Sequence, residues 1–363
     1  MANRIFLTTI LPEHLIGKHR LSFAAANFSA NLMSGGGFDK VYSILPLYVG
    51  GEMETEAFGD KRFELVYNHR LRKCGGRMTL LACLAEQWKI FKRIPKGAQV
   101  WTYNLNTLYA FTVMLLKMFK PSVQVNVIVL DFTPVEKGFG LNRIYLKMIN
   151  RAHGNICLAN SDLFTCSRRK TLPGVVPAER EDNPKVDTPA MSFLLSGALN
   201  ETISQTSMVL EAFAQTPQCT LHVTGFSDNA KIIEEYAANY PNIVYHRQLP
   251  FKQYLELLHS VTFQLSTRKP DSPENQCNFP SKIIEALLHN RAIVTTIHYP
   301  QLDGVKVVEC LEPGIEAFKR TLNQLAAMSD EQLSAFVNQG DEVWRRYSPQ
   351  VWYETMRKIE ESK

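Results

Sequence analysis

Residues 261–296 read VTFQLSTRKPDSPENQCNFPSKIIEALLHNRAIVTT, and this stretch decides the fold. The β-branched, apolar run at its start predicts a strand, and AIVTT predicts a second one. A loop rich in turn-forming residues separates the first strand from Phe279-Pro280-Ser281-Lys282, where a helix is expected to begin. Strand, helix and strand in this order form the repeating unit of a parallel sheet.

The same alternation continues along the chain in both directions. MSFLLSGAL, CTLHVTG and NIVYHRQL predict further strands of the second half, separated by amphipathic segments. In the first half, strands are expected at Arg4–Thr9, Lys40–Leu45, Phe63–Tyr67, Gln99–Tyr103, Gln124–Leu130 and Asn155–Ala159. Helices are expected between them at Leu21–Met33, Met78–Phe91, Leu108–Phe119 and Leu141–Ala152.

A proline-rich, charged segment divides the two alternating halves, and it reads as a linker. The sequence therefore predicts an α/β chain with two Rossmann-like, doubly wound domains facing across a cleft. Domain boundaries are expected at 1–175 for the first domain, 176–189 for the linker and 190–345 for the second. Residues 346–363 follow a Ser-Pro start signal and are expected to form a helix that packs back on the first domain.

Charge is distributed unevenly between the two halves. Residues 1–178 hold 23 Lys+Arg against 11 Asp+Glu, whereas residues 179–363 hold 17 against 24. The halves thus carry +12 and −7, which indicates two units that face different partners. The seven cysteines occur singly, without C-x-x-C spacing, so neither a disulfide framework nor a zinc site is indicated. No apolar run reaches the ~20 residues that span a bilayer, and a cytoplasmic protein is expected.

Lys282 and Glu285 lie one turn apart at the start of the predicted helix. A helix N-terminus presents free N–H groups and a positive partial charge, so it favours an anion, and Lys282 adds a full charge there. A cation followed by a carboxylate one turn further on can hold a diphosphate and the ribose hydroxyls of one nucleotide. The sequence also places Gly225 and Leu249 at the ends of neighbouring strands, where backbone can approach a ligand.

The segment Phe279-Pro280-Ser281-Lys282, with Glu285 and Leu287, resembles the F-P-S-K-x-x-E-x-L donor-site motif of GT-B glycosyltransferases that build bacterial polysaccharides. VNVIVLDFTP, SGALN and LHVTG are similar to further segments of the same enzymes. The resemblance implies a nucleotide-sugar site in the second domain and catalytic roles for Lys282 and Glu285. The donor-site residues that it implies are Gly197, Gly225, Leu249, Arg268, Ser281, Lys282 and Glu285.

Two features depart from that family. Retaining members often carry a second glutamate eight positions before the first, and Cys277 occupies the place here. Many members also carry Arg and Lys in the loop after the first strand of the second domain, whereas residues 197–202 contain no cation. The phosphate contacts would then depend on Lys282 and Arg268.

Acceptor-side residues are expected at strand ends of the first domain. Asp131 ends VNVIVLD and could take a proton from an incoming hydroxyl, which would make it a third catalytic residue. Asn104 and His69 end two further strands and are expected to bind the acceptor. No Asp-x-Asp occurs, so no metal and no cofactor are expected beside the nucleotide sugar, and cations with the helix dipole would stabilise the leaving diphosphate.

The leading hypothesis is a metal-independent glycosyltransferase of polysaccharide biosynthesis, which transfers a sugar from a nucleotide donor to a glycan or lipid-linked glycan. The alternatives are a nucleotide-sugar epimerase of the same fold and a catalytically silent nucleotide-sugar-binding subunit of a transferase complex. No nucleic-acid module is recognisable. Basic segments interleaved with apolar residues in the first half, WKIFKRIPK, MLLKMFK and SRRK, predict peripheral binding to an anionic membrane surface at the inner face of the membrane.

Overall fold

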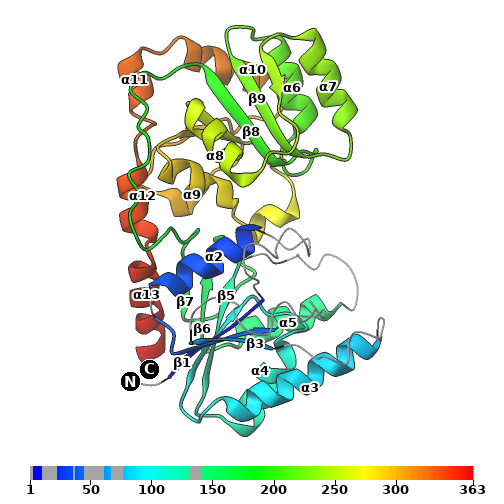
Figure 1. Cartoon of the computed structure of the whole chain (residues 1–363), viewed down its shortest axis with the longest axis vertical. Helices are drawn as coiled ribbons and strands as arrows, with labels where there is room; N and C mark the ends of the chain where they lie inside the picture. Colours follow the sequence, from blue (N-terminus) through cyan, green and yellow to red (C-terminus); the bar gives the residue numbers. More distant parts are fainter. Residues whose placement is uncertain are drawn as a thin grey trace. The chain divides into compact units, whose positions relative to one another are not determined.

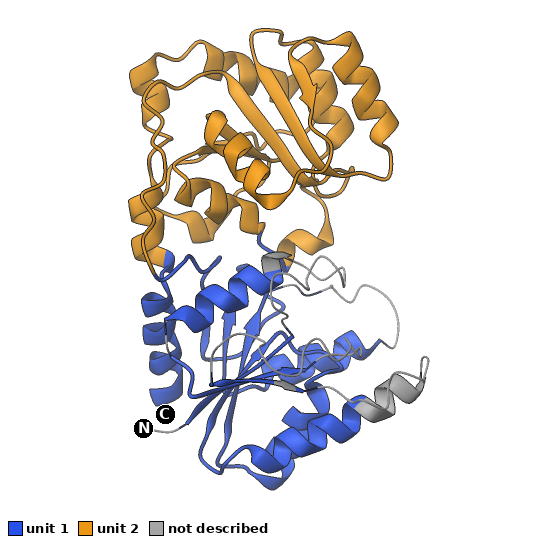
Figure 2. Ribbon diagram, in the orientation of Figure 1, with its two compact units in different colours: residues 1–178, 277–279, 347–363 blue, residues 179–276, 280–346 orange. Residues whose placement is uncertain are grey.

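The computed structural model describes residues 3–9, 23–35, 37–44, 61–66, 77–130, 132 and 140–362 (Figure 1). The chain divides into two compact units. Unit 1 comprises residues 1–178, 277–279 and 347–363, and unit 2 comprises residues 179–276 and 280–346 (Figure 2). Each unit is built on one parallel sheet with helices on both faces, so the predicted α/β fold class is confirmed.

The sheet of unit 1 has the strand order β3-β2-β1-β4-β5-β6-β7 among the described residues, and its paired strands are parallel. The order reverses between β1 and β4, as in a doubly wound sheet. Its strands are β1 (Arg4–Thr8), β2 (Lys40–Ile44), β3 (Phe63–Val66), β4 (Gln99–Tyr103), β5 (Gln124–Val129), β6 (Gly154–Cys157) and β7 (Arg169–Thr171).

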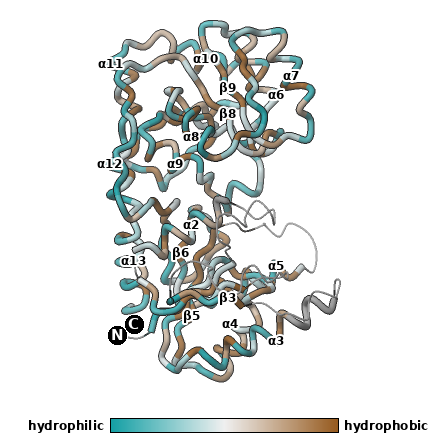
Figure 3. The backbone as a smooth tube through the Cα atoms, in the orientation of Figure 1, coloured by the Kyte–Doolittle hydropathy of each residue, from teal (hydrophilic) through white to brown (hydrophobic). Residues whose placement is uncertain are grey.

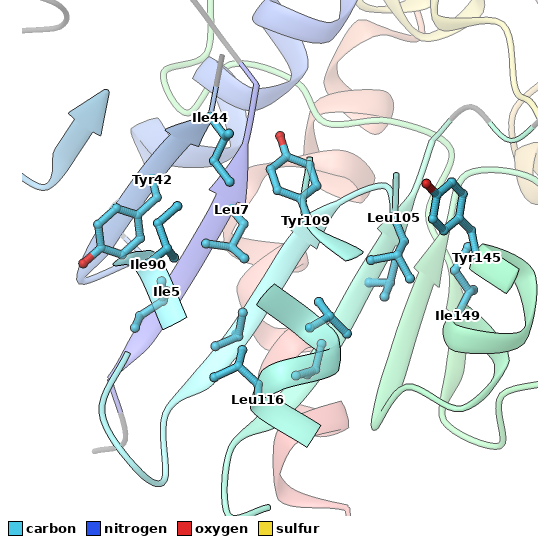
Figure 4. Packing of buried hydrophobic residues seen from close by; sticks show 14 of the residues in the cluster. Ile5, Leu7, Tyr42, Ile44, Ile90, Leu105, Tyr109, Leu116, Tyr145 and Ile149 are labelled. Atoms are coloured by element: carbon cyan, nitrogen blue, oxygen red, sulfur yellow. The ribbon is translucent and has the colours of Figure 1, made fainter. Parts of the chain in front are cut away.

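Three helices cover one face of this sheet: α3 (Arg77–Arg93), α4 (Ala110–Phe119) and α5 (Leu141–Asn150). Their apolar side chains form a cluster with alternate residues of the strands, including Ile5, Leu7 and Val127. Figure 4 labels Leu116 and Tyr109 among the residues of this cluster, with Ile90 near Ile5 and Leu7. β5 is buried from Val125 to Val129, and these residues are apolar except Asn126, as expected for a strand covered on both faces.

The opposite face is covered by α2 (Phe23–Ser34) and by the C-terminal helix α13 (Pro349–Glu361). Trp352 of α13 is fully buried, its ring meets Phe28 edge-on at 5.2 Å, and its indole N–H donates to the Gly174 carbonyl at 2.8 Å. Glu360 accepts from the Trp101 indole at 2.7 Å and from Arg4 at 2.6 Å. These contacts fix α13 to the sheet of unit 1.

The sheet of unit 2 has the order β10-β9-β8-β11-β12-β13 among the described residues, again with parallel pairs. Its strands are β8 (Ser192–Ala198), β9 (Thr220–Phe226), β10 (Ile243–Tyr245), β11 (Phe263–Ser266), β12 (Ala292–Thr295) and β13 (Val308–Glu309). The strand order reverses between β8 and β11. In open α/β sheets, ligands bind at the carboxyl ends of the strands at such a switch point.

Helices lie on both faces of the second sheet. On one face, α6 (Thr206–Ala214), α7 (Ala230–Asn239) and α10 (Ile315–Ala326) contribute to a core around Phe193 and Phe263. On the other face, α9 (Ser281–Leu288) contacts β11 and β12, and α8 (Phe251–Ser260) is joined to α9 by side-chain hydrogen bonds. Two helices follow, α11 (Asp330–Ser334) and α12 (Gly340–Tyr347). The strands of both sheets are largely hydrophobic, whereas α12 is mostly hydrophilic (Figure 3).

The predicted strands agree with the structure to within two residues wherever they are described, with one exception. NIVYHRQL was predicted as a strand to Leu249, whereas β10 ends at Tyr245, and Arg247 has a positive φ of 57° that an extended strand does not allow. The sequence did not predict β7 and β13, which are edge strands of three and two residues. Strands this short produce no periodic pattern. Among the described residues, no helix combines the length and apolarity needed to cross a bilayer.

Candidate functional site

Residues from β8, β11 and α9 meet at the switch point of unit 2. Lys282, in the first turn of α9, donates from Nζ to the Ser196 carbonyl of β8 at 2.6 Å. A Cβ placed on Gly197 would lie 3.8 Å from the same ammonium. Arg268 follows β11 by two residues and is close enough to Lys282 to act on its charge. Two cations therefore lie together at the carboxyl ends of neighbouring strands.

The Lys282 ammonium lies in an unfavourable environment for a cation. Its pKa is lowered to about 8, first by burial and then by the positive charge of Arg268, while Glu285 acts in the opposite direction. Burial disfavours the charged form of a lysine, and a neighbouring like charge disfavours it further. A bound anion would offset both penalties by its attraction to the two cations.

Arg268 has hydrogen-bonding capacity that the described residues leave unused. Its Nε and Nη1 atoms are buried and make no hydrogen bond there. Its backbone carbonyl, in contrast, accepts from Gln205 Nε2 at 3.0 Å and from Thr296 Oγ1 at 2.6 Å, which fixes the main chain. Leaving buried donors unpaired costs about 1–3 kcal/mol, so such groups generally have a partner. A guanidinium with unused donors is suited to bind a phosphate.

The N-terminus of α9 adds a third positive element. Its N-cap is Pro280, which offers no side chain to cap the first-turn N–H groups, and Ser281 is exposed beside it. Uncapped N–H groups at a helix start carry a positive partial charge and favour an anion. Helix α9 thus begins at Ser281, one residue before Lys282, with Pro280 as its cap.

Glu285 lies one turn after Lys282 and is held by a tyrosine. The Tyr254 hydroxyl of α8 donates to Glu285 Oε2 at 2.7 Å. Burial raises the pKa of the Glu285 carboxyl, and the hydrogen bond from Tyr254 and the charge of Lys282 oppose the rise. The sequence interpretation missed Tyr254, because nothing in the spacing of residues 251–260 distinguishes it from a core aromatic residue.

The two glycines among the predicted donor-site residues face each other across paired strands. Gly197 of β8 is in register with Gly225 of β9, and both have positive φ, +98° and +143°. A Cβ on Gly225 would lie 2.8 Å from the carbonyl carbon of Gly197 and closer still to its oxygen. The close approach that requires glycine here is therefore between two strands. Leu249 is partly exposed and directly precedes Pro250, the N-cap of α8.

Of the predicted acceptor-side residues, Asp131 and His69 lie outside the described residues. Asn104 is described, and it forms a turn after β4 with a positive φ of 56°. Its side-chain oxygen accepts from the Leu130 backbone N–H at 2.7 Å, and its own N–H donates to the Ile128 carbonyl. These bonds connect the ends of β4 and β5.

Cys277 belongs to unit 1 and is fully buried in its hydrophobic cluster. Burial raises the pKa of its thiol to about 11, so it is a neutral core residue. The six described cysteines are free and buried. No group of three or more potential metal ligands occurs among the described residues.

The fold is that of GT-B glycosyltransferases, two doubly wound α/β units in one chain, and comparison with solved structures supports it. The N-terminal domain of Candida albicans trehalose-6-phosphate phosphatase matches with a TM-score of 0.70 and 13% identity, over 99% of this chain and 97% of that one. Anabaena HepE, solved with UDP and glucose, matches with a TM-score of 0.65 and 14% identity, over 99% of both chains. A trehalose-6-phosphate synthase, OtsA, gives 0.68 and 10% over the full length of both. By sequence, the chain matches no protein-family model and no curated protein.

Proposed function

We propose that this protein is a glycosyltransferase that binds the diphosphate of a nucleotide sugar in unit 2, through Arg268, Lys282 and the start of α9. The observation that carries the proposal is the unpaired, buried part of the Arg268 guanidinium beside an ammonium whose pKa is lowered. An anion with two or more negative charges satisfies both groups. The fold supports the same conclusion, because HepE, which shares it, was solved with UDP and glucose.

These residues can assist the reaction without a metal. In sugar transfer, the bond between the anomeric carbon and the terminal phosphate oxygen breaks, and the anomeric carbon bonds to an acceptor hydroxyl oxygen that loses its proton. Negative charge develops on the leaving nucleoside diphosphate. Two cations and a helix N-terminus held ready in a desolvated site stabilise that charge in the transition state. We propose Asp131 as the group that takes the proton of the acceptor hydroxyl.

Glu285 is proposed to bind the ribose hydroxyls of the donor. Glu285→Gln should therefore weaken binding of UDP by about tenfold, the lower range for a hydrogen bond to a charged group. Binding of inorganic pyrophosphate should stay within about twofold, because pyrophosphate has no ribose. Titration calorimetry of both ligands with both proteins measures this. An equal loss of affinity for the two ligands would place Glu285 at the phosphates instead.

A thermal-shift panel of nucleoside diphosphates and nucleotide sugars would identify the base of the nucleotide, because a ligand that binds only the folded protein raises its melting temperature. Donor hydrolysis by the purified chain separates an active enzyme from a silent binding subunit. Dependence of donor turnover on an added acceptor separates a transferase from an epimerase. We propose a glycan or lipid-linked glycan of polysaccharide biosynthesis as the acceptor.

An anionic membrane surface is the proposed location of that acceptor, and the outer faces of α4 and α5 support this. Five of their apolar residues are exposed, with no acidic residue in either helix. They are Met114, Met118, Phe119, Leu141 and Ile144. Arg143 and Lys147 of α5 are exposed among them. Apolar side chains flanked by cations are typical of a face that lies in the headgroup region.

Some of the cations that suggested membrane binding have local roles instead. Lys120 donates to the carbonyls of Phe91 and Ile94, at the end of α3, and Lys117 donates to the Arg151 carbonyl. Arg169, in the SRRK segment, donates to carbonyls of residues 161 and 164. The proposed membrane face is therefore limited to α3, α4 and α5.

Sedimentation with vesicles tests this face. Binding to anionic vesicles is expected at low salt and should fade at high salt, because each basic residue near the surface contributes about 1 kcal/mol that salt screens. Neutralising Lys89, Lys92, Arg93 and Lys96 together should weaken binding at least tenfold. Replacing Met118 and Phe119 by serine should also weaken it, whereas Leu311→Ser, an equally exposed residue of unit 2, should not. If the protein does not bind anionic vesicles even at low salt, the membrane proposal is wrong, but the proposed donor site is not affected by that result.

A further inference from the structure

Tyr254 holds the carboxylate of Glu285, which is proposed to bind the ribose. It projects from α8, and its hydroxyl donates to Glu285 Oε2 at 2.7 Å. Because Glu285 is on α9, this hydrogen bond fixes the carboxylate between two helices. Burial and, after it, the negative charge of Glu285 raise the pKa of the Tyr254 hydroxyl well above its usual value. The proton therefore remains on Tyr254, which acts as a donor throughout the accessible pH range.

Buried polar groups of two neighbouring strands lie near Tyr254. Gln264 Nε2, on β11, donates to the Ser196 hydroxyl of β8 at 3.2 Å, and both residues are buried. Ser196 is close enough to Tyr254 to lower the pKa of its hydroxyl. The hydrogen bond from Tyr254 to Glu285 therefore lies in a buried, polar environment, where such a bond is stronger than in water.

We infer that Tyr254 is a positioning residue of the donor site, which holds Glu285 with Oε2 occupied so that Oε1 is presented to the ribose hydroxyls. This inference rests on the proposed donor site. It identifies a residue that, through Glu285, affects how well the site distinguishes a nucleotide from an isolated diphosphate. A carboxylate fixed in one rotamer loses less entropy when it accepts a ligand's hydrogen bonds than a carboxylate that is free to rotate.

Ser196 lies near both Tyr254 and the proposed phosphate-binding group. Its carbonyl accepts from Lys282 Nζ at 2.6 Å, while its hydroxyl accepts from Gln264 and acts on the pKa of Tyr254. Ser196→Ala removes the hydroxyl and keeps the carbonyl, so it tests the effect on Tyr254 without removing the acceptor of the Lys282 hydrogen bond.

The test is Tyr254→Phe, measured by calorimetry with UDP and with inorganic pyrophosphate. UDP affinity should fall by about fivefold to tenfold, no more than in Glu285→Gln, because Tyr254 acts on the ligand only through Glu285. Pyrophosphate affinity should not change. The dependence on pH should change as well. Without the tyrosine the pKa of Glu285 rises further, so the loss of UDP affinity on acidification should begin at a higher pH than in the wild-type protein. Ser196→Ala should shift both quantities in the same direction by a smaller amount.

A matched control is Tyr236→Phe. Tyr236 on α7 donates to Glu211 on α6 at 2.6 Å, so this substitution removes an equivalent bond outside the donor site and should leave UDP affinity unchanged. In a Glu285→Gln background, Tyr254→Phe should have little further effect, because the two residues act as a unit. Equal losses from Tyr254→Phe in both backgrounds would overturn the positioning role. If the wild-type protein binds no nucleoside diphosphate, the proposed function fails and this inference fails with it.

Discussion

Lys282→Ala should lower the affinity for UDP and for inorganic pyrophosphate by about tenfold to a hundredfold. A charge-assisted hydrogen bond contributes about 1.5–3 kcal/mol, and Lys282 also supplies a full positive charge at the start of α9. Its ammonium is already held at 2.6 Å from the Ser196 carbonyl, so little reorganisation is needed for it to meet a phosphate. Titration calorimetry with the two ligands measures the loss.

The control is Lys252→Ala, an exposed lysine on α8 of the same unit. It changes the net charge by the same amount, and it should leave both affinities within about twofold, because an exposed charge at a distance is screened. Equal affinities for wild-type and Lys282→Ala would show that the anion does not bind at this site. A loss of folded structure in the mutant is excluded by its melting curve.

The pKa of Lys282 predicts how donor binding depends on pH. With a pKa of about 8 in the unliganded protein, Lys282 is mostly charged at pH 7 and mostly neutral at pH 9. A diphosphate is already ionised across this range, since the last phosphate proton leaves near pH 6. UDP affinity should therefore fall as the pH rises through about 8, and Lys282→Ala should abolish the fall. Arg268→Gln should move the pH at which UDP affinity falls to a higher value, because the nearby positive charge of Arg268 lowers the pKa of Lys282.

The parts of the candidate site that could be read from the sequence carry charge or follow a helix-start signal. Lys282, Glu285 and Arg268 all derive from one segment, in which Pro280 and the turn-forming loop before it determine where the helix begins. Their contacts depend on how distant segments pack. Tyr254 lies 31 positions from Glu285 and Ser196 lies 86 positions from Lys282, so no local pattern could have paired them.

The interpretation of Gly225 illustrates a second limit. A glycine after a strand was expected to allow close approach to a ligand, and it does permit a close approach, but to the backbone of Gly197. Sequence indicates that a position needs a residue without a side chain. It does not indicate which neighbour requires this, because strand register depends on the whole sheet. The paired glycines therefore suggest an experiment on the pairing of β8 with β9, the strands that carry Gly197 and Gly225.

Gly225→Ala should destabilise the protein by about 3 kcal/mol, because the new methyl group must displace the backbone of the neighbouring strand, a larger cost than moving a side chain. Part of that cost is conformational, since a φ of +143° is unfavourable for alanine. Gly314→Ala measures this part alone: Gly314 is in the same unit, has a φ of +97°, and has nothing within 4 Å of its Cβ position. It should cost about 1 kcal/mol. Urea unfolding of the two variants gives the difference.

Gly225→Ala should also affect donor binding. Because Gly197 follows Ser196, displacing this strand should weaken the contact between Lys282 and the Ser196 carbonyl, and UDP affinity should fall in Gly225→Ala but not in Gly314→Ala. Equal stabilities for the two variants would show that the strands separate at no cost and that the glycine pair does not constrain the site.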